Sequence, residues 1–172
     1  EIERRTVYSV LSKPVARGEF ITGKYLGLCL TLLVNVLIMG VGVSLALAYV
    51  GAGKLVFSIW GAICLIFFEL TILTGVAILF SSFSSPALSA LLTFLVFIIG
   101  HFSAALREFA ENLGSNAAKA FFNFLYYFLP NLSNYSFIVN AAHGDVPPVS
   151  FFFGAIIYAL FYNAILIAAA VF

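Results

Sequence analysis

The 172-residue sequence is 63% hydrophobic, 17% aromatic and only 9% charged. Soluble domains average about 45–50% apolar and about 25% charged residues, so a water-soluble fold of this composition would expose large apolar patches. The net charge of +1 offers no basic surface for nucleic acid. The composition excludes the soluble and disordered classes and predicts an integral membrane protein.

Five of the eight cations fall within the first 24 residues, and residues 1–12 form a charged stretch compatible with a helix. Glu1, Arg5, Ser9 and Ser12 share one face at helical spacing, so this helix is amphipathic. Pro14 disfavours a helical residue before it, and we expect the helix to end near Ser12. A second helix is expected to begin near Arg17 and to continue into the membrane. The beginning of the sequence has no signal-peptide pattern.

Long apolar stretches predict four membrane-spanning helices, because about 20 apolar residues cross the hydrocarbon. They lie at about 24–50, 55–80, 86–102 and 149–172. The first two are separated by the turn residues Gly51 to Lys54, which resemble a phosphate loop. That motif needs Ser or Thr at position 55, where this sequence has Leu, so no ATPase site is expected.

The segment 103–148 separates the last two predicted spans and contains Arg107, Glu108, Glu111 and Lys119. Within it, residues 120–129 are rich in Phe and Tyr and predict a short interfacial or partly re-entrant helix. Four spans leave both ends on one side, and the excess of cations there predicts that this side is cytoplasmic. The fold class is therefore an all-α, polytopic transmembrane bundle with an extracytoplasmic segment at 103–148. Five spans are the alternative.

Glu69 lies near the middle of the second predicted span, where a charged carboxylate costs about 2.5–3.5 kcal/mol. It has to be protonated, paired or facing a polar cavity. The expected partners are Thr71, Thr74 or Asn35, or a residue outside this sequence. Two interpretations stay open: a neutral Glu that hydrogen-bonds between helices, and a part in substrate or proton passage.

His101 ends the third predicted span, and imidazole and carboxylate ligands suit Zn, Cu or Fe. The candidate co-ligands are Glu108, Glu111, His143 and Asp145. Their spacing matches no compact ligand motif, so we expect no metal and no cofactor. The sequence also lacks a Ser-His-Asp set, an acid–base pair within one span and a Cys-x-x-Cys, which argues against catalysis by this chain.

Three blocks near the N-terminus resemble the coupling-helix signature of ABC-2-type transporter permeases. They are Glu3-Arg4-Arg5-Thr6, the run from Leu11-Ser12-Lys13-Pro14 through Arg17 to Phe20, and Gly23-Lys24-Tyr25-Leu26-Gly27. Three later stretches are similar to the same group, namely Phe80 to Pro86, Ile99-Gly100-His101 and Leu129-Pro130-Asn131-Leu132. The resemblance covers most of the chain, and the N-terminal blocks are its most specific part.

The resemblance implies a cytoplasmic coupling segment at 1–23 and a transmembrane domain at 24–172, which would be the last four spans of a six-span permease. The residues that would contact a separate ATPase subunit are Glu3, Arg4, Arg5, Ser12 and Arg17. Two permease subunits would pair, as a homodimer or heterodimer, around an export pathway in a bacterial or archaeal plasma membrane. Segment 103–148 would form the extracytoplasmic gate.

The competing hypothesis is a non-transport membrane anchor or regulatory module that holds a cytoplasmic partner through the same basic helix. Charge reversal at Arg4 and Arg5 separates the two. A transporter loses substrate-stimulated ATP hydrolysis while the protein stays inserted.

Overall fold

The computed structural model describes residues 16–103, 105, 108 and 116–172, and every regular element in these ranges is helical. The elements are α2 (Arg17–Tyr49), α3 (Leu55–Ser81), α4 (Pro86–His101), α6 (Asn116–Phe128), the 3-10 helix η1 (Leu132–Tyr135), α7 (Ile138–Ala142) and α8 (Val149–Val171). The all-α prediction is confirmed. The helix predicted to begin near Arg17 does run without a break into the first predicted span.

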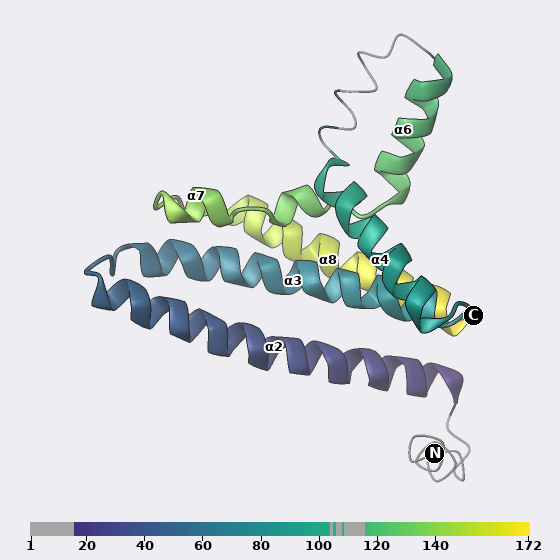
Figure 1. The fold of residues 1–172 in the computed structure, drawn as a ribbon, viewed down its shortest axis with the longest axis horizontal. Coiled ribbons are helices and arrows are strands. Elements are labelled where there is room, and N and C mark those ends of the chain that lie inside the picture. Colours follow the sequence, from purple (N-terminus) through teal and green to yellow (C-terminus); the bar gives the residue numbers. More distant parts are fainter. Residues whose placement is uncertain (1–15, 104, 106–107, 109–115) are drawn as a thin grey trace.

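Three long helices lie side by side, with α3 between α2 and α8 (Figure 1). α3 and α8 run in the same direction, and α2 runs against them. The start of α2 meets the ends of the other two helices, where Ile21 and Tyr25 pack against Ile78 and Ala170. We call this the Arg17 end of the bundle. The described N-terminal residues and the C-terminus both lie there (Figure 1).

Helices α2, α3 and α8 have 33, 27 and 23 residues, and each is long and apolar enough to cross a membrane. α4 has only 16 residues. At about 1.5 Å per residue it rises about 24 Å, less than the about 30 Å of hydrocarbon. The third predicted span therefore does form a helix, but this helix is too short to cross the hydrocarbon unaided.

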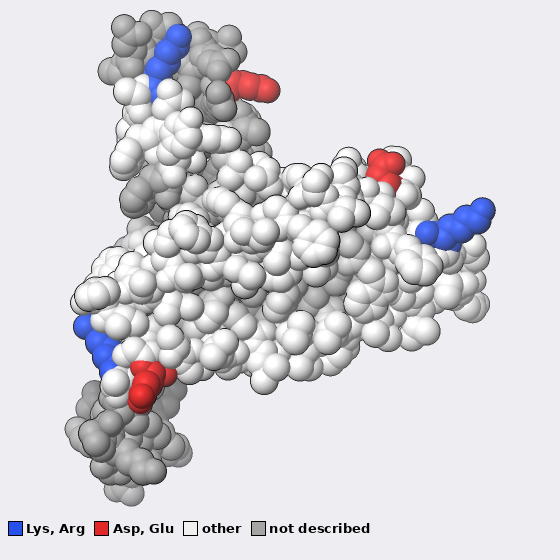
Figure 2. Space-filling view, turned by 180° about the vertical axis from the view of Figure 1, so that it is seen from behind, with Lys and Arg blue, Asp and Glu red and all other residues white. Residues whose placement is uncertain are grey.

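Charged side chains gather at the two ends of the long helices and around α6, and the wide surface between them is uncharged (Figure 2). That surface consists of large apolar side chains such as Leu30 at 62% exposure and Ile38 at 66%. A soluble protein rarely exposes a patch of this kind, whereas lipid tails solvate it without cost. The described part of the chain is a helical membrane bundle.

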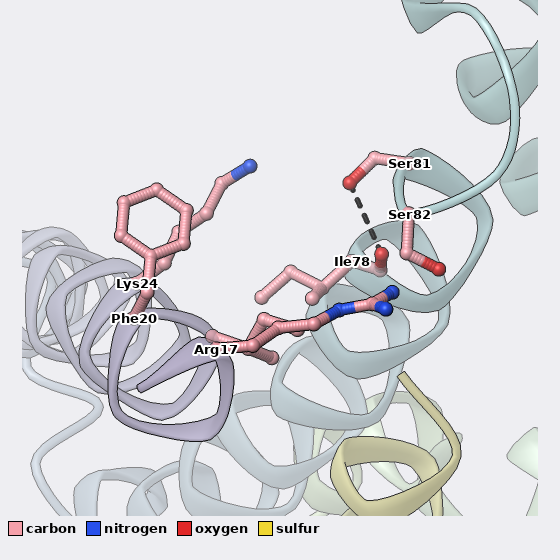
Figure 3. Close-up of a pocket in the computed structure, with 7 residues that line it drawn as sticks. Arg17, Phe20, Lys24, Ile78, Ser81 and Ser82 are labelled. Carbon is pink, nitrogen blue, oxygen red and sulfur yellow. Dashed lines mark hydrogen bonds between the residues drawn. The ribbon is translucent and has the colours of Figure 1, made fainter. Parts of the chain in front are cut away.

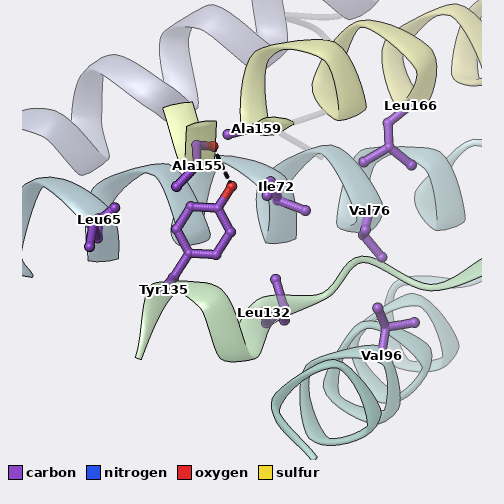
Figure 4. Close-up of a cluster of buried hydrophobic side chains, with 9 residues drawn as sticks. All are labelled: Leu65, Ile72, Val76, Val96, Leu132, Tyr135, Ala155, Ala159 and Leu166. Atoms are coloured by element: carbon purple, nitrogen blue, oxygen red, sulfur yellow. Dashed lines mark hydrogen bonds between the residues drawn. The ribbon is translucent and has the colours of Figure 1, made fainter. Parts of the chain in front are cut away.

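The core lies where α3 faces α8, η1 and α4 (Figure 4). α8 contributes the small residues Ala155 and Ala159, which let its backbone approach α3 closely. Ten residues of α3 are buried, against three of α2. The fully buried side chains in this core include Leu65, Ile72, Leu132, Tyr135 and Ala159. α3 is therefore the central helix to which the other elements attach.

The last half of α3 and its first half are covered by different segments. α4 runs antiparallel along the last half, where Ser89 Oγ donates a hydrogen bond of 3.1 Å to the carbonyl of Ala77. Residues 132–142 follow the first half, where Ser58 Oγ donates to the carbonyl of Ala141 at 2.9 Å. α6 belongs to the part of the chain that joins these two segments, and it extends away from the bundle (Figure 1). A helix was expected in this region, and one is present.

The turn between α2 and α3 requires a glycine at one position. Gly51 has a φ of +80°, a conformation that side chains with a Cβ rarely adopt. The residues that resemble a phosphate loop thus form a turn that joins two antiparallel helices, as expected from the sequence.

We expect Gly51→Ala to destabilise the protein by about 1 kcal/mol, because the left-handed conformation disfavours a Cβ although no heavy atom lies within 4 Å of its position. The matched control is Gly53→Ala, which also meets no atom within 4 Å and has an ordinary φ. Near-UV circular dichroism of the purified protein in detergent should show a lower unfolding midpoint for the first variant only. Equal midpoints would show that the turn tolerates a side chain.

Candidate functional site

The predicted ATPase contact is described at one of its five residues. Glu3, Arg4, Arg5 and Ser12 lie outside the described residues. Arg17 is the first residue of α2, and its side chain is exposed at the Arg17 end. Because Arg17 is part of α2, a partner that contacts Arg17 contacts a 33-residue helix directly. The described geometry therefore connects the predicted contact to a long membrane helix.

Glu69 lies in the middle of α3 and is only 7% exposed. Its Oε1 atom is 3.3 Å from His101 Nδ1, at the end of α4. Thr71, Thr74 and Asn35 were the partners predicted within this sequence, and that prediction was wrong. A further partner outside this sequence stays a prediction. Thr71 instead donates to the carbonyl of Phe68 at 2.7 Å. The two atoms of the Glu69–His101 pair lie at ion-pair distance without the alignment of a hydrogen bond.

In the Glu69–His101 pair, the Glu69 side chain is enclosed and the His101 side chain is partly exposed. The side chain of Glu69 is 9% exposed and that of His101 is 32% exposed. The imidazole packs against the ring of Phe97, with 5.0 Å between ring centroids. An imidazole beside a carboxylate can bind a proton and then compensate the negative charge of the carboxylate. The chemistry available here is proton binding and charge compensation.

A second polar contact joins α3 to α8. Asn163 Nδ2 donates a hydrogen bond of 3.1 Å to Thr71 Oγ1, and both side chains are buried. Gly75 makes room for the amide, because a Cβ there would lie 3.0 Å from Asn163 Oδ1. Asn163 was not among the residues predicted from the sequence. The signal was present, since it is the one amide side chain in the apolar stretch 149–172.

A third polar cluster forms where α4, η1 and α8 meet. Asn131 Oδ1 accepts hydrogen bonds from Ser103 Oγ at 2.9 Å and from Ser133 Oγ at 2.6 Å. The backbone N–H of Asn131 donates to the Tyr158 hydroxyl at 3.1 Å. The bond to Tyr158 gives one backbone N–H of the non-helical segment before η1 a protein partner, which such backbone requires inside a membrane.

The candidate metal ligands are not brought together where they are described. His101 faces Glu69, and His143 Nδ1 lies 2.8 Å from the carbonyl of Val139 in its own short helix. Glu111 lies outside the described residues. Within the described ranges, no three His, Cys, Asp or Glu side chains form a group that could hold a metal ion.

Comparison with known protein families gives one match. The sequence of residues 1–172 matches the family described as ABC-2 family transporter protein. The chain belongs to the ABC-2 transporter family. The same comparisons match it to no curated protein and to no solved structure.

Membership of the ABC-2 family agrees with the helical membrane bundle and with the N-terminal resemblance. Members of this family form the membrane component of ATP-binding-cassette transporters. The chain is therefore an ABC-2 permease, and the polar contacts described above lie inside a transport protein.

Proposed function

We propose that this ABC-2 permease is an exporter subunit that receives mechanical work from a separate ATPase subunit. Residues 1–23 form the cytoplasmic coupling segment, and residues 24–172 form the transmembrane domain. The ATPase contact consists of Glu3, Arg4, Arg5, Ser12 and Arg17. A second permease subunit completes the pathway, in the plasma membrane of a bacterium or an archaeon. The chain itself does not catalyse hydrolysis.

The observation that carries this proposal is the continuity of α2. The helix begins at Arg17, at the predicted contact, and continues for 33 residues without a proline. A helix with unbroken backbone hydrogen bonds moves as a rod on the timescale of domain motion. A displacement of the coupling segment therefore moves the whole length of α2.

The packing at the Arg17 end supports transmission to the rest of the bundle. Ile21 and Tyr25 are both 8% exposed and contact the last turns of α3 and α8. Gly18 lies in the same region, where a Cβ would be 3.6 Å from Val171. When α2 rotates or tilts, these contacts move the ends of α3 and α8 or have to slide.

The remainder of α2 is poorly covered, which supports a second permease subunit as the partner. Only Gly40 is buried beyond Tyr25, against the side chains of Trp60 and Ile63. In the assembled transporter the exposed face is covered by lipid or by the paired subunit. ATP-driven closure of two ATPase subunits would rock the two α2 helices and open the pathway between the permeases.

We expect the double reversal Arg4→Glu, Arg5→Glu to abolish coupling, because like charges then face the acidic or polar groove that the arginines enter. The variant permease is co-expressed with its cognate ATPase subunit. Co-purification of the two subunits should be lost, and transport-linked ATP hydrolysis should fall to the level of the free ATPase. The permease should still fractionate with membranes.

The matched control is Lys54→Glu, which reverses one cation at the opposite end of the bundle, just before α3. It should leave co-purification and ATP hydrolysis unchanged. If the arginine variant still co-purifies with the ATPase and remains coupled, the contact assignment is wrong. If the arginine variant loses the ATPase subunit, but the wild-type complex shows no transport coupled to ATP hydrolysis, the chain is an anchor.

A further inference from the structure

Two cations share one face of α2 at the Arg17 end. Arg17 and Lys24 are seven residues apart, which is two helical turns, so they project in similar directions. They line an open hollow of 210 Å³ between the start of α2 and the end of α3 (Figure 3). Ser81 and Ser82 close the hollow on the α3 side.

Neither Arg17 nor Lys24 forms an ion pair with a described carboxylate, and Glu19, in the first turn of α2, does not line the hollow. The ion pair in the described residues joins His101 to Glu69, and it lies near the middle of α3, away from this hollow. The hydroxyl of Ser81 donates to the carbonyl of Ile78 at 3.0 Å, and that of Ser82 donates to Leu79 at 2.7 Å. Neither hydroxyl can cancel a formal charge. The hollow therefore attracts an anion.

The wall beneath the two cations is apolar. Ile21 and Ile78 are 8% and 5% exposed, and Phe20 contributes a ring at 58% exposure beside Lys24 (Figure 3). A ligand that fits both the two cations and the apolar wall has an anionic group at one end and an apolar body at the other. A free inorganic anion would use the cations and leave the apolar wall unused.

We expect the hollow to lie at the level of the lipid headgroups. α2 enters its long apolar stretch directly after Lys24, and the Arg17 end is one of the two charged ends of the molecule (Figure 2). Basic pockets between membrane helices at this depth suit the phosphates of anionic lipids. Arg presents a planar fork to a phosphate, and Lys adds a point charge.

From this geometry we propose that the hollow between α2 and α3 is a binding site for one anionic phospholipid. Arg17 and Lys24 hold the phosphate, and the acyl chain passes over Phe20 and Ile78. The lipid joins the first turns of α2 to the last turn of α3. It thereby steadies the position at which the coupling segment meets the bundle. This site depends on membrane insertion and not on the proposed coupling to an ATPase.

Native mass spectrometry of the detergent-purified chain tests the site. The probes are phosphatidylglycerol, phosphatidylcholine and inorganic phosphate, each titrated separately. The wild type should retain one phosphatidylglycerol in preference to phosphatidylcholine. Lys24→Gln should weaken this binding about fivefold, the effect of about 1 kcal/mol for one cation near a phosphate. Lys24 is chosen because Arg17 also belongs to the proposed ATPase contact.

The matched control is Lys54→Gln, the same substitution at the opposite end of the bundle, and it should leave the affinity unchanged. Circular dichroism of all three proteins reports whether each variant is folded. Equal binding of the two lipids would overturn the proposal, as would equal affinities of Lys24→Gln and Lys54→Gln. Binding of inorganic phosphate as tight as that of phosphatidylglycerol would show an anion site that does not select lipid.

Discussion

Gly100→Ala is expected to lower the stability of the bundle by about 1–3 kcal/mol, the usual cost of forcing an extra carbon into a packed site. A Cβ at Gly100 would lie 2.8 Å from the carbonyl oxygen of Pro130 and 2.8 Å from Leu132 Cγ. Real Cβ atoms essentially never come this close, and the Pro130 oxygen belongs to the backbone. The end of α4 would have to separate from the segment that leads into η1.

The separation would also expose part of the core, because Leu132 is fully buried. Gly42→Ala is the matched control, since Gly42 is a helical glycine of α2 with no heavy atom within 4 Å of its Cβ position. It should be neutral or slightly stabilising, as alanine favours the helix. The unfolding midpoint in detergent measures both variants. Equal midpoints would mean that α4 and residues 130–132 are not in this close contact.

His101→Ala should destabilise the protein by about 2–3 kcal/mol, because it leaves Glu69 buried without its partner. Removing one member of a fully buried ion pair costs about 3–5 kcal/mol. We expect less here, since the His101 side chain is 32% exposed and the pair is therefore not fully buried.

Glu69→Gln should behave differently, because the amide carries no charge and has nearly the same shape. It should leave the unfolding midpoint almost unchanged, and the double variant Glu69→Gln, His101→Ala should recover most of the stability lost in His101→Ala. A double-mutant cycle measures this coupling. Additive effects of the two substitutions would show that the side chains do not interact.

The same variants decide between the two interpretations of Glu69. If the pair serves proton or substrate passage, Glu69→Gln should impair transport while the protein remains folded and bound to its ATPase. If transport is unchanged, the pair has a structural role, which is to hold the end of α4 against the middle of α3.

Much of the fold could be predicted from the sequence, because hydrocarbon imposes strong local constraints. The apolar stretches had to be helical, since a spanning segment must satisfy its own backbone hydrogen bonds. Pro86 and the Gly51 turn placed two helix boundaries correctly. The start of α2 at Arg17 followed from Pro14 and the charge pattern. These features depend on residues that are neighbours in the chain.

The sequence by itself determined that this chain is a helical membrane protein and that Glu69 needs compensation, because burial of a carboxylate is costly whatever lies beside it. Only the tertiary structure decided that His101 supplies it, 32 positions later in the chain. The pairing requires α4 to run back along α3 and to stop beside Glu69, where Gly100 admits residues 130–132. Hydropathy reports how long each helix is and carries no information on which faces meet.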